Sequence, residues 1–128
     1  MRRSAPREPQ GRPSEQEEWE AELLRGWVDT HKRAMLTPVI LALVRTRAPV
    51  AADALRSAVE EATGWTLTER GLYRTLKRLA DQGLLTRTEA EAERTGAKTN
   101  LFALTGAGGR LLAAVIDDHT RLGRAFGL

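Results

Sequence analysis

Residues 65–105 read WTLTERGLYRTLKRLADQGLLTRTEAEAERTGAKTNLFALT, and this stretch decides the fold. Its first half predicts an α-helix that begins near Thr66 or Thr68, because a threonine side chain can cap the free N–H groups of a first helical turn. Leucines at spacings of four and three then form one apolar face: Leu72, Leu76 and Leu79. Such a face is typical of a helix that packs on a hydrophobic core.

The other side of the same predicted helix is basic. At about 100° per residue, Arg70, Arg74 and Lys77 point away from the leucines. Arg78 lies on one flank of this cationic stripe, and Tyr73 borders the apolar face. A solvated helix surface is the simplest interpretation of such a charge run. The residues that follow the helix favour a second interpretation.

A β-hairpin is expected directly behind the basic helix. Gly83 is placed to end the helix. The segments 84–88 and 100–104 are rich in residues that favour strands, and a polar connection containing Gly96 joins them. A basic helix followed at once by a hairpin is the order of the recognition helix and wing in a winged helix-turn-helix domain. We therefore expect a mainly α fold with a small β-hairpin and a winged helix-turn-helix DNA-binding domain over residues 35–104.

Two further helices are expected to complete that domain. Thr37 as N-cap and Pro38 at the first helical position predict the start of one helix, which Pro49 ends. Its inner side holds Val39, Ile40, Leu43 and Val44. The next helix is predicted from about residue 51 to 63 and buries either Ala54 or Leu55, together with Ala58, Val59 and Ala62.

Both ends of the chain carry a predicted helix that a winged helix core does not require. In residues 14–34, Trp19, Leu23 and Trp27 recur every four residues. In residues 105–128, Thr105 caps a final helix whose stripe includes Leu112, Val115, Ile116 and His119. These stripes need a partner surface, and the simplest one is a second copy of the chain. The alternative is that the two helices pack on each other within one chain.

Composition limits the classes of function. The chain has 128 residues, of which 41% are apolar, enough for a single modest core. It has no cysteine, two histidines and no glycine-rich phosphate loop, so we expect no enzyme, no cofactor and no metal site. No apolar run approaches the length of a membrane span, and the expected location is the cytoplasm.

The net charge of +3 comes entirely from residues 1–13, which hold four arginines against one glutamate. This segment also contains three prolines, and we predict a disordered basic arm. Such an arm is either a passive terminus or a further contact with DNA.

Three segments together resemble the PadR family of bacterial transcriptional regulators. They are RGLYRTLKRL at residues 70–79, QGLL at 82–85 and LFALT at 101–105. In that family a leucine and a tyrosine open the recognition helix, and an aromatic residue with leucine and threonine leads into a dimerising C-terminal helix. The chain departs from the family at residues 50–55, VAADAL, where a His/Tyr-Gly-Tyr-Glu-like segment is usual. The contacts that family members make through that segment are therefore not expected in this chain.

The resemblance implies a homodimeric repressor that binds double-stranded operator DNA, with the helix of residues 72–82 in the major groove. The residues expected to contact DNA are Arg70, Tyr73, Arg74, Lys77, Arg78 and, at the wing tip, Lys98. Some members bind planar aromatic compounds between tryptophans, which makes Trp19 and Trp27 candidate residues for an effector. The alternative function is a winged helix used only for protein contacts, and its best support is the acidic wing with Glu89, Glu91 and Glu93.

Overall fold

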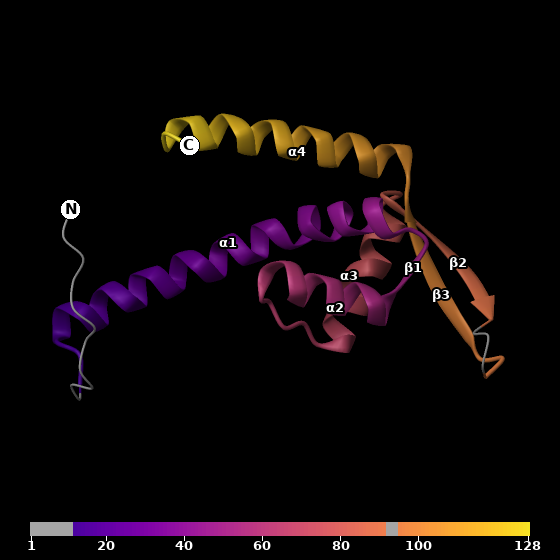
Figure 1. Cartoon of the computed structure of the whole chain (residues 1–128), viewed down its shortest axis with the longest axis horizontal. Helices are drawn as coiled ribbons and strands as arrows, with labels where there is room; N and C mark the ends of the chain where they lie inside the picture. Colours follow the sequence, from indigo (N-terminus) through magenta and orange to yellow (C-terminus); the bar gives the residue numbers. More distant parts are fainter. Residues whose placement is uncertain (1–11, 92–94) are drawn as a thin grey trace. The chain divides into compact units, whose positions relative to one another are not determined.

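The computed structural model describes residues 12–91 and 95–128 (Figure 1). Its elements are α1 (Glu15–Arg47), β1 (Val50–Ala51), α2 (Ala52–Thr63), α3 (Glu69–Asp81), β2 (Leu85–Glu91), β3 (Lys98–Leu104) and α4 (Gly106–Ala125). The chain divides into two compact units, Met1–Met35 and Leu36–Leu128. The mainly helical fold with a small antiparallel sheet is confirmed. Most of the predicted basic arm, including Arg2, Arg3 and Arg7, lies outside the described residues.

Helix α1 corrects the prediction of two separate helices before residue 49. It is one helix of 33 residues with Pro38 inside it. Its start is a capping box: the Ser14 Oγ accepts from the Glu17 N–H at 3.1 Å, and the Glu17 carboxylate accepts from the Ser14 N–H at 2.9 Å. Pro38 removes only one N–H, the donor to the carbonyl of Ala34, and Ala34 is exposed, so water can satisfy that carbonyl. The helical φ of proline therefore lets the helix continue through the position where the sequence predicts a helix start.

The core lies in the second unit, and every helix and strand there contributes at least one buried side chain to it. Its buried side chains are Ile40, Leu41, Val44, Val50, Leu55, Val59, Leu72, Leu76, Leu79, Leu85, Phe102 and Leu112. The three predicted leucines of α3 are among them, which confirms the apolar face of that helix. In α2 the structure selects Leu55 over Ala54, and Ala62 is exposed rather than buried as predicted.

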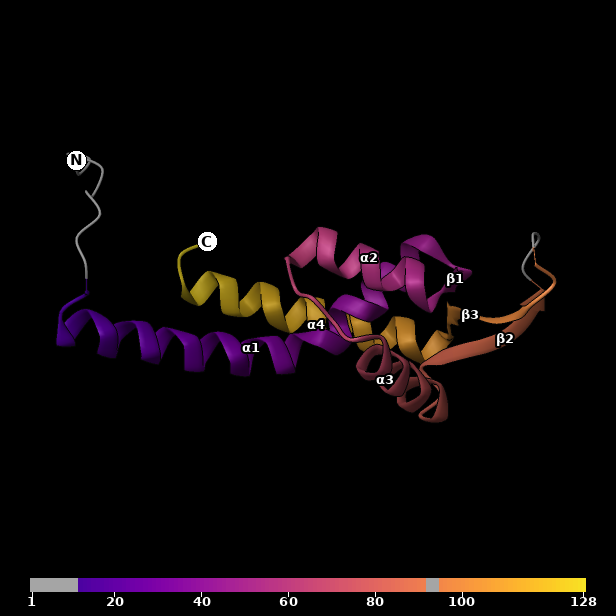
Figure 2. The same ribbon diagram turned by 90° about the horizontal axis from the view of Figure 1, so that it is seen from below.

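The sheet has three strands in the order β1-β3-β2 rather than the two predicted. Strand β1 contains only two residues, and Val50 pairs with Phe102 while Ala51 pairs with Leu101. So short a strand has no alternation of apolar and polar residues that a sequence pattern would reveal. In the hairpin, β2 pairs with β3 from Leu85↔Leu104 to Glu91↔Lys98, and the two strands project from the helices (Figures 1 and 2).

Both ends of α3 are fixed by the residues that the sequence indicated. The Thr68 Oγ1 accepts a hydrogen bond from the Gly71 N–H at 3.0 Å. After the last turn, Gly83 takes a φ of 79°, which only glycine adopts readily. The Gly83 N–H then bonds to the carbonyl of Ala80, and the Leu84 N–H bonds to that of Leu79, both at 3.0 Å. This pair of bonds is a Schellman motif, and it turns the chain directly into β2.

The junction between the wing and α4 explains how a helix can begin with glycines. The Thr105 Oγ1 accepts from the Gly108 N–H at 3.0 Å and donates to the carbonyl of Gly83 at 2.7 Å. One threonine thus caps α4 and ties it to the end of α3. Gly108 is buried, and a Cβ atom at this position would collide with the carbonyl oxygen of Leu84. The first turn of α4 therefore packs closely on the α3–β2 turn, which compensates for the low helix propensity of its glycines.

Candidate nucleic-acid interface

Helix α3 presents its polar face to solvent. Its leucines are buried, whereas Arg70, Arg74 and Lys77 are exposed. Tyr73 keeps 42% of its surface accessible even though it borders the apolar face. The helix therefore offers one aromatic and several cationic side chains on the side that the core does not use, which is the arrangement the sequence predicted.

The basic side chains of α3 differ in their partners. The Lys77 ammonium lies 3.2 Å from a carboxylate oxygen of Asp81, one turn further along. Arg78 sits on the opposite flank from Tyr73, and its guanidinium lies 3.5 Å from the Thr37 Oγ1 of α1. Within residues 12–91 and 95–128, neither Arg70 nor Arg74 has an ion pair or a hydrogen bond from its side chain. These two arginines are therefore the cations of α3 most available to an anionic partner.

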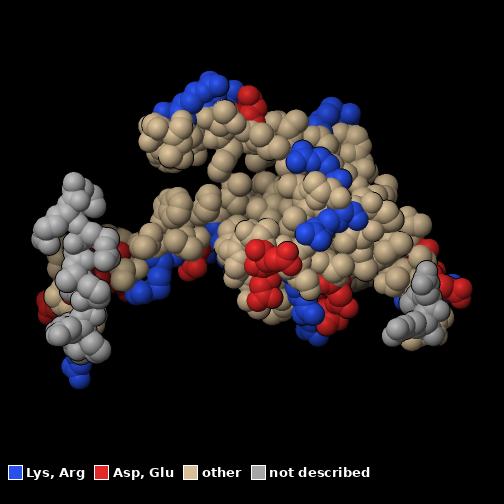
Figure 3. Space-filling model, viewed as in Figure 1, with Lys and Arg blue, Asp and Glu red and all other residues tan. Residues whose placement is uncertain are grey.

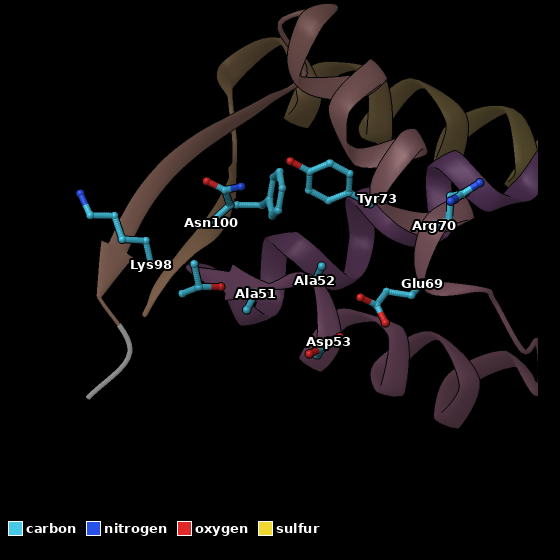
Figure 4. A pocket seen from close by; sticks show the side chains of 10 residues that line it. Ala51, Ala52, Asp53, Glu69, Arg70, Tyr73, Lys98 and Asn100 are labelled. Atoms are coloured by element: carbon cyan, nitrogen blue, oxygen red, sulfur yellow. The ribbon is translucent and has the colours of Figure 1, made fainter. Parts of the chain in front are cut away.

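A groove of about 570 Å³ lies between the start of α2, the start of α3 and the wing (Figure 4). Its lining residues are Ala51, Ala52, Asp53, Glu69, Arg70, Tyr73, Lys98, Thr99, Asn100 and Phe102. The hydroxyl end of Tyr73 points toward the strand that carries Asn100, whereas Arg70 points away from this centre (Figure 4). Two cations and two carboxylates line the groove, so its charge is mixed rather than strongly positive.

The structure brings only part of the predicted DNA-contacting set together. Arg70, Tyr73 and Lys98 share the groove. Arg74 instead lines a smaller hollow of about 340 Å³ beside the α2–α3 turn, with Leu36, Thr66 and Leu67 among its neighbours. Acidic and basic side chains are interspersed on the face that Figure 3 shows. On this face, an anion would therefore be bound by individual side chains rather than by a large patch of one sign.

Sequence reasoning missed Asp53 and Asn100 as groove residues. Asp53 opens α2, and Asn100 lies in the middle of β3. The two segments approach each other because β1 pairs with β3 just before α2 begins. Only the register of that two-residue strand, which has no recognisable sequence pattern, would have revealed the neighbourhood.

The first unit carries the two predicted tryptophans on an exposed helix surface. Trp19 and Trp27 are 55% and 59% accessible. The ring of Trp27 stacks on His31, with centroids 4.8 Å apart and an interplanar angle of 10°. Leu23, Leu24 and Val28 of the same segment are also exposed. This helix surface is apolar, but as a site for a planar effector it stays a prediction.

In the final helix, α4, one of the four residues predicted for the dimer interface is wrong. Leu112 is only 2% exposed and belongs to the core of its own chain, so its side chain is not available to a second copy. Val115 is half-buried, whereas Ile116 is 45% exposed and His119 is exposed. Leu111 and Leu122 are exposed as well. A periodic stripe shows that a helix packs somewhere, but it does not show on which chain each position packs.

A helix-turn-helix followed by a hairpin wing, with the polar face of α3 open to solvent, defines a winged helix protein. A family model described as the transcriptional regulator PadR-like family matches residues 40–114, more than half of the chain. The chain belongs to this family. No curated protein matches it.

Within its described residues, none of the helices combines the length and apolar character needed to cross a membrane.

Solved structures share the fold. A PadR-like transcription factor from Bacteroides fragilis is 24% identical with a TM-score of 0.67, and the match covers 80% of this chain and 96% of that one. A PadR family regulator from Eggerthella lenta is 22% identical with a TM-score of 0.72, covering 84% and 92%. Bacillus subtilis PadR, solved in complex with operator DNA, is 24% identical with a TM-score of 0.57, covering 64% of this chain and 45% of that one.

Proposed function

We propose that this PadR-like regulator is a homodimeric repressor that binds double-stranded operator DNA with α3 in the major groove. The observation that carries the proposal is the exposed side of α3, where Arg70 and Arg74 lack partners among the described residues and Tyr73 is accessible. A helix enters the major groove with its N-terminal residues toward the base edges, and Arg70 and Tyr73 lie in the first part of α3. The operator-bound Bacillus subtilis PadR supports the same use of the fold.

Each basic residue of α3 has a role that follows from its surroundings. Arg70 and Arg74 are free to bond to phosphates or to guanine edges, which arginine recognises with two parallel hydrogen bonds. Lys77 is held at 3.2 Å by Asp81, and the pair must open before Lys77 contacts a phosphate. Arg78 lies on the flank that faces Thr37, so we place it at a groove wall. Lys98 would contact DNA from the wing.

Dimerisation is proposed from two separate apolar surfaces. The first unit exposes Trp19 and Trp27, and α4 exposes Ile116 together with Leu111 and Leu122. Soluble monomers rarely leave contiguous apolar patches of this kind uncovered, and a symmetric homodimer is the commonest way to cover them. We keep Val115, Ile116 and His119 in the interface and remove Leu112. A dimer would also present two copies of α3 to two half-sites.

The competing function is a winged helix that contacts only proteins. The acidic side chains Glu89 and Glu91 of the wing, and Asp53 and Glu69 of the groove, favour it because they repel phosphate. The two functions differ in their response to salt, since binding to DNA releases the counterions that surround the phosphates.

Titration of a fluorescent random-sequence duplex with the wild-type protein at several salt concentrations separates the two functions. We expect binding whose log affinity falls linearly with log salt, with a slope of about 0.9 for each phosphate contact. A duplex that stays unbound at low salt, while the protein is folded by circular dichroism, would favour the protein-contact function.

A further inference from the structure

The described part of the wing carries all of its charges on one face. Residues that pair directly across antiparallel strands point to the same side of a sheet. The charged residues belong to the pairs Arg87↔Phe102, Glu89↔Asn100 and Glu91↔Lys98. The pairs of the opposite face contain no charge: Thr86↔Ala103, Thr88↔Leu101 and Ala90↔Thr99. Three of the four β3 residues that line the groove, Lys98, Asn100 and Phe102, lie on the charged face, and Thr99 lies on the other. The charged face is therefore the main border of the groove.

On this face Lys98 is held by one of two nearby carboxylates. The Lys98 Nζ lies 3.4 Å from the Glu89 Oε1, diagonally across the hairpin. Glu91 is the direct partner of Lys98 in the ladder, yet among the described residues its carboxylate forms no ion pair. The two glutamates have the same charge, the same strand and the same face, but only Glu89 holds the lysine.

We propose that Glu89 is a positioning residue that restrains Lys98 and thereby weakens the contact of the wing with DNA. This inference rests on the proposed DNA-binding function. When Lys98 contacts a phosphate it must leave Glu89, and the released carboxylate then lies close to the same phosphate. The ion pair therefore opposes the contact twice, by occupying the cation and by repelling its new partner.

The restraint is moderate, because the pair is open to water. The Lys98 and Glu89 side chains are 68% and 62% exposed. Exposed pairs of this kind change an equilibrium by no more than about five-fold, and salt screens them. Glu89 therefore tunes the affinity of the wing and does not block it, which leaves the exposed arginines of α3 as the main source of binding.

The test uses Glu89→Gln and its matched control Glu91→Gln, each made in the wild-type chain and in a Lys98→Gln chain. Affinity for a fluorescent random-sequence duplex is measured at several salt concentrations, and circular dichroism confirms that every protein is folded. We expect Glu89→Gln to tighten binding about two- to five-fold at low salt, and the gain should shrink as salt screens the ion pair. Glu91→Gln should gain less, and in the Lys98→Gln chain the gain from Glu89→Gln should disappear.

Equal gains from the two glutamine variants, or a gain from Glu89→Gln that persists without Lys98, would show that the carboxylates act only through their charge and would overturn the inference. The inference also fails alone if the wild type binds DNA and Glu89→Gln does not bind more tightly. If no protein of the set binds the duplex, including the wild type, the proposed function fails and the inference fails with it.

Discussion

Replacing Arg74 and Lys77 together with alanine is expected to reduce DNA affinity by about 10- to 100-fold, because a hydrogen bond to a charged group is worth about 1.5–3 kcal/mol. The loss should come mainly from Arg74, since Lys77 already has Asp81 at 3.2 Å. Both side chains are exposed, so the fold should be unaffected. Fluorescence titrations at several salt concentrations should also show a shallower salt slope, by about 0.9 for each contact removed.

The control for this prediction is the double variant Arg121→Ala, Arg124→Ala in α4. It removes the same number of cations from exposed positions outside the recognition helix. We expect it to retain most of the wild-type affinity. If the α3 variant binds as tightly as the wild type, or if the α4 variant loses as much affinity, the exposed face of α3 is not the DNA site.

Replacing Gly108 with alanine is expected to destabilise the fold by about 3 kcal/mol, the upper part of the range for overpacking a tight contact. The added Cβ would overlap the carbonyl oxygen of Leu84 and approach the Leu104 Cδ1 to 2.8 Å. Relief requires the first turn of α4 to move away from the α3–β2 turn, which also breaks the hydrogen bond from Thr105 to Gly83. Chemical denaturation followed by circular dichroism measures the change.

Gly109→Ala is the matched control, because it adds the same methyl group one residue later. Its Cβ would meet no atom closer than the Leu104 Cδ2 at 3.9 Å. Alanine is a better helix former than glycine by about 1 kcal/mol, so this variant should be neutral or slightly more stable. Equal stability of the two variants would mean that the close packing at Gly108 does not contribute to the fold.

The sequence predicted the parts of the fold that depend on local signals. Thr68 and Gly83 mark the ends of α3 because a cap bond and a positive φ are properties of single residues. The hairpin behind α3 followed from the same local chemistry. The prediction of a helix start at Pro38 is wrong because the φ of proline suits both a first helical position and a helix interior, and the residue that loses its hydrogen bond, Ala34, is exposed.

The candidate site was predicted less completely, because it depends on tertiary contacts. The pairing of β1 with β3 brings Asp53 and Asn100 into one groove with Tyr73, although these residues are far apart in the sequence. The ion pair between Lys98 and Glu89 depends on the register of the hairpin. Leu112 was assigned to the dimer interface because helical periodicity cannot distinguish the core of one chain from a surface between two.

In the proposed complex, a dimer places two copies of α3 in the major groove. The direct measurement is protection of guanine N7 atoms from dimethyl sulfate, on a duplex that the wild-type protein selects from a random-sequence library. Guanine N7 lies in the major groove, whereas adenine N3 lies in the minor groove. We predict two clusters of protected guanines whose centres lie about 10 base pairs apart or a multiple of this. Protection limited to adenine N3, or a single cluster of protected guanines, would contradict binding of a dimer through two copies of α3 in the major groove.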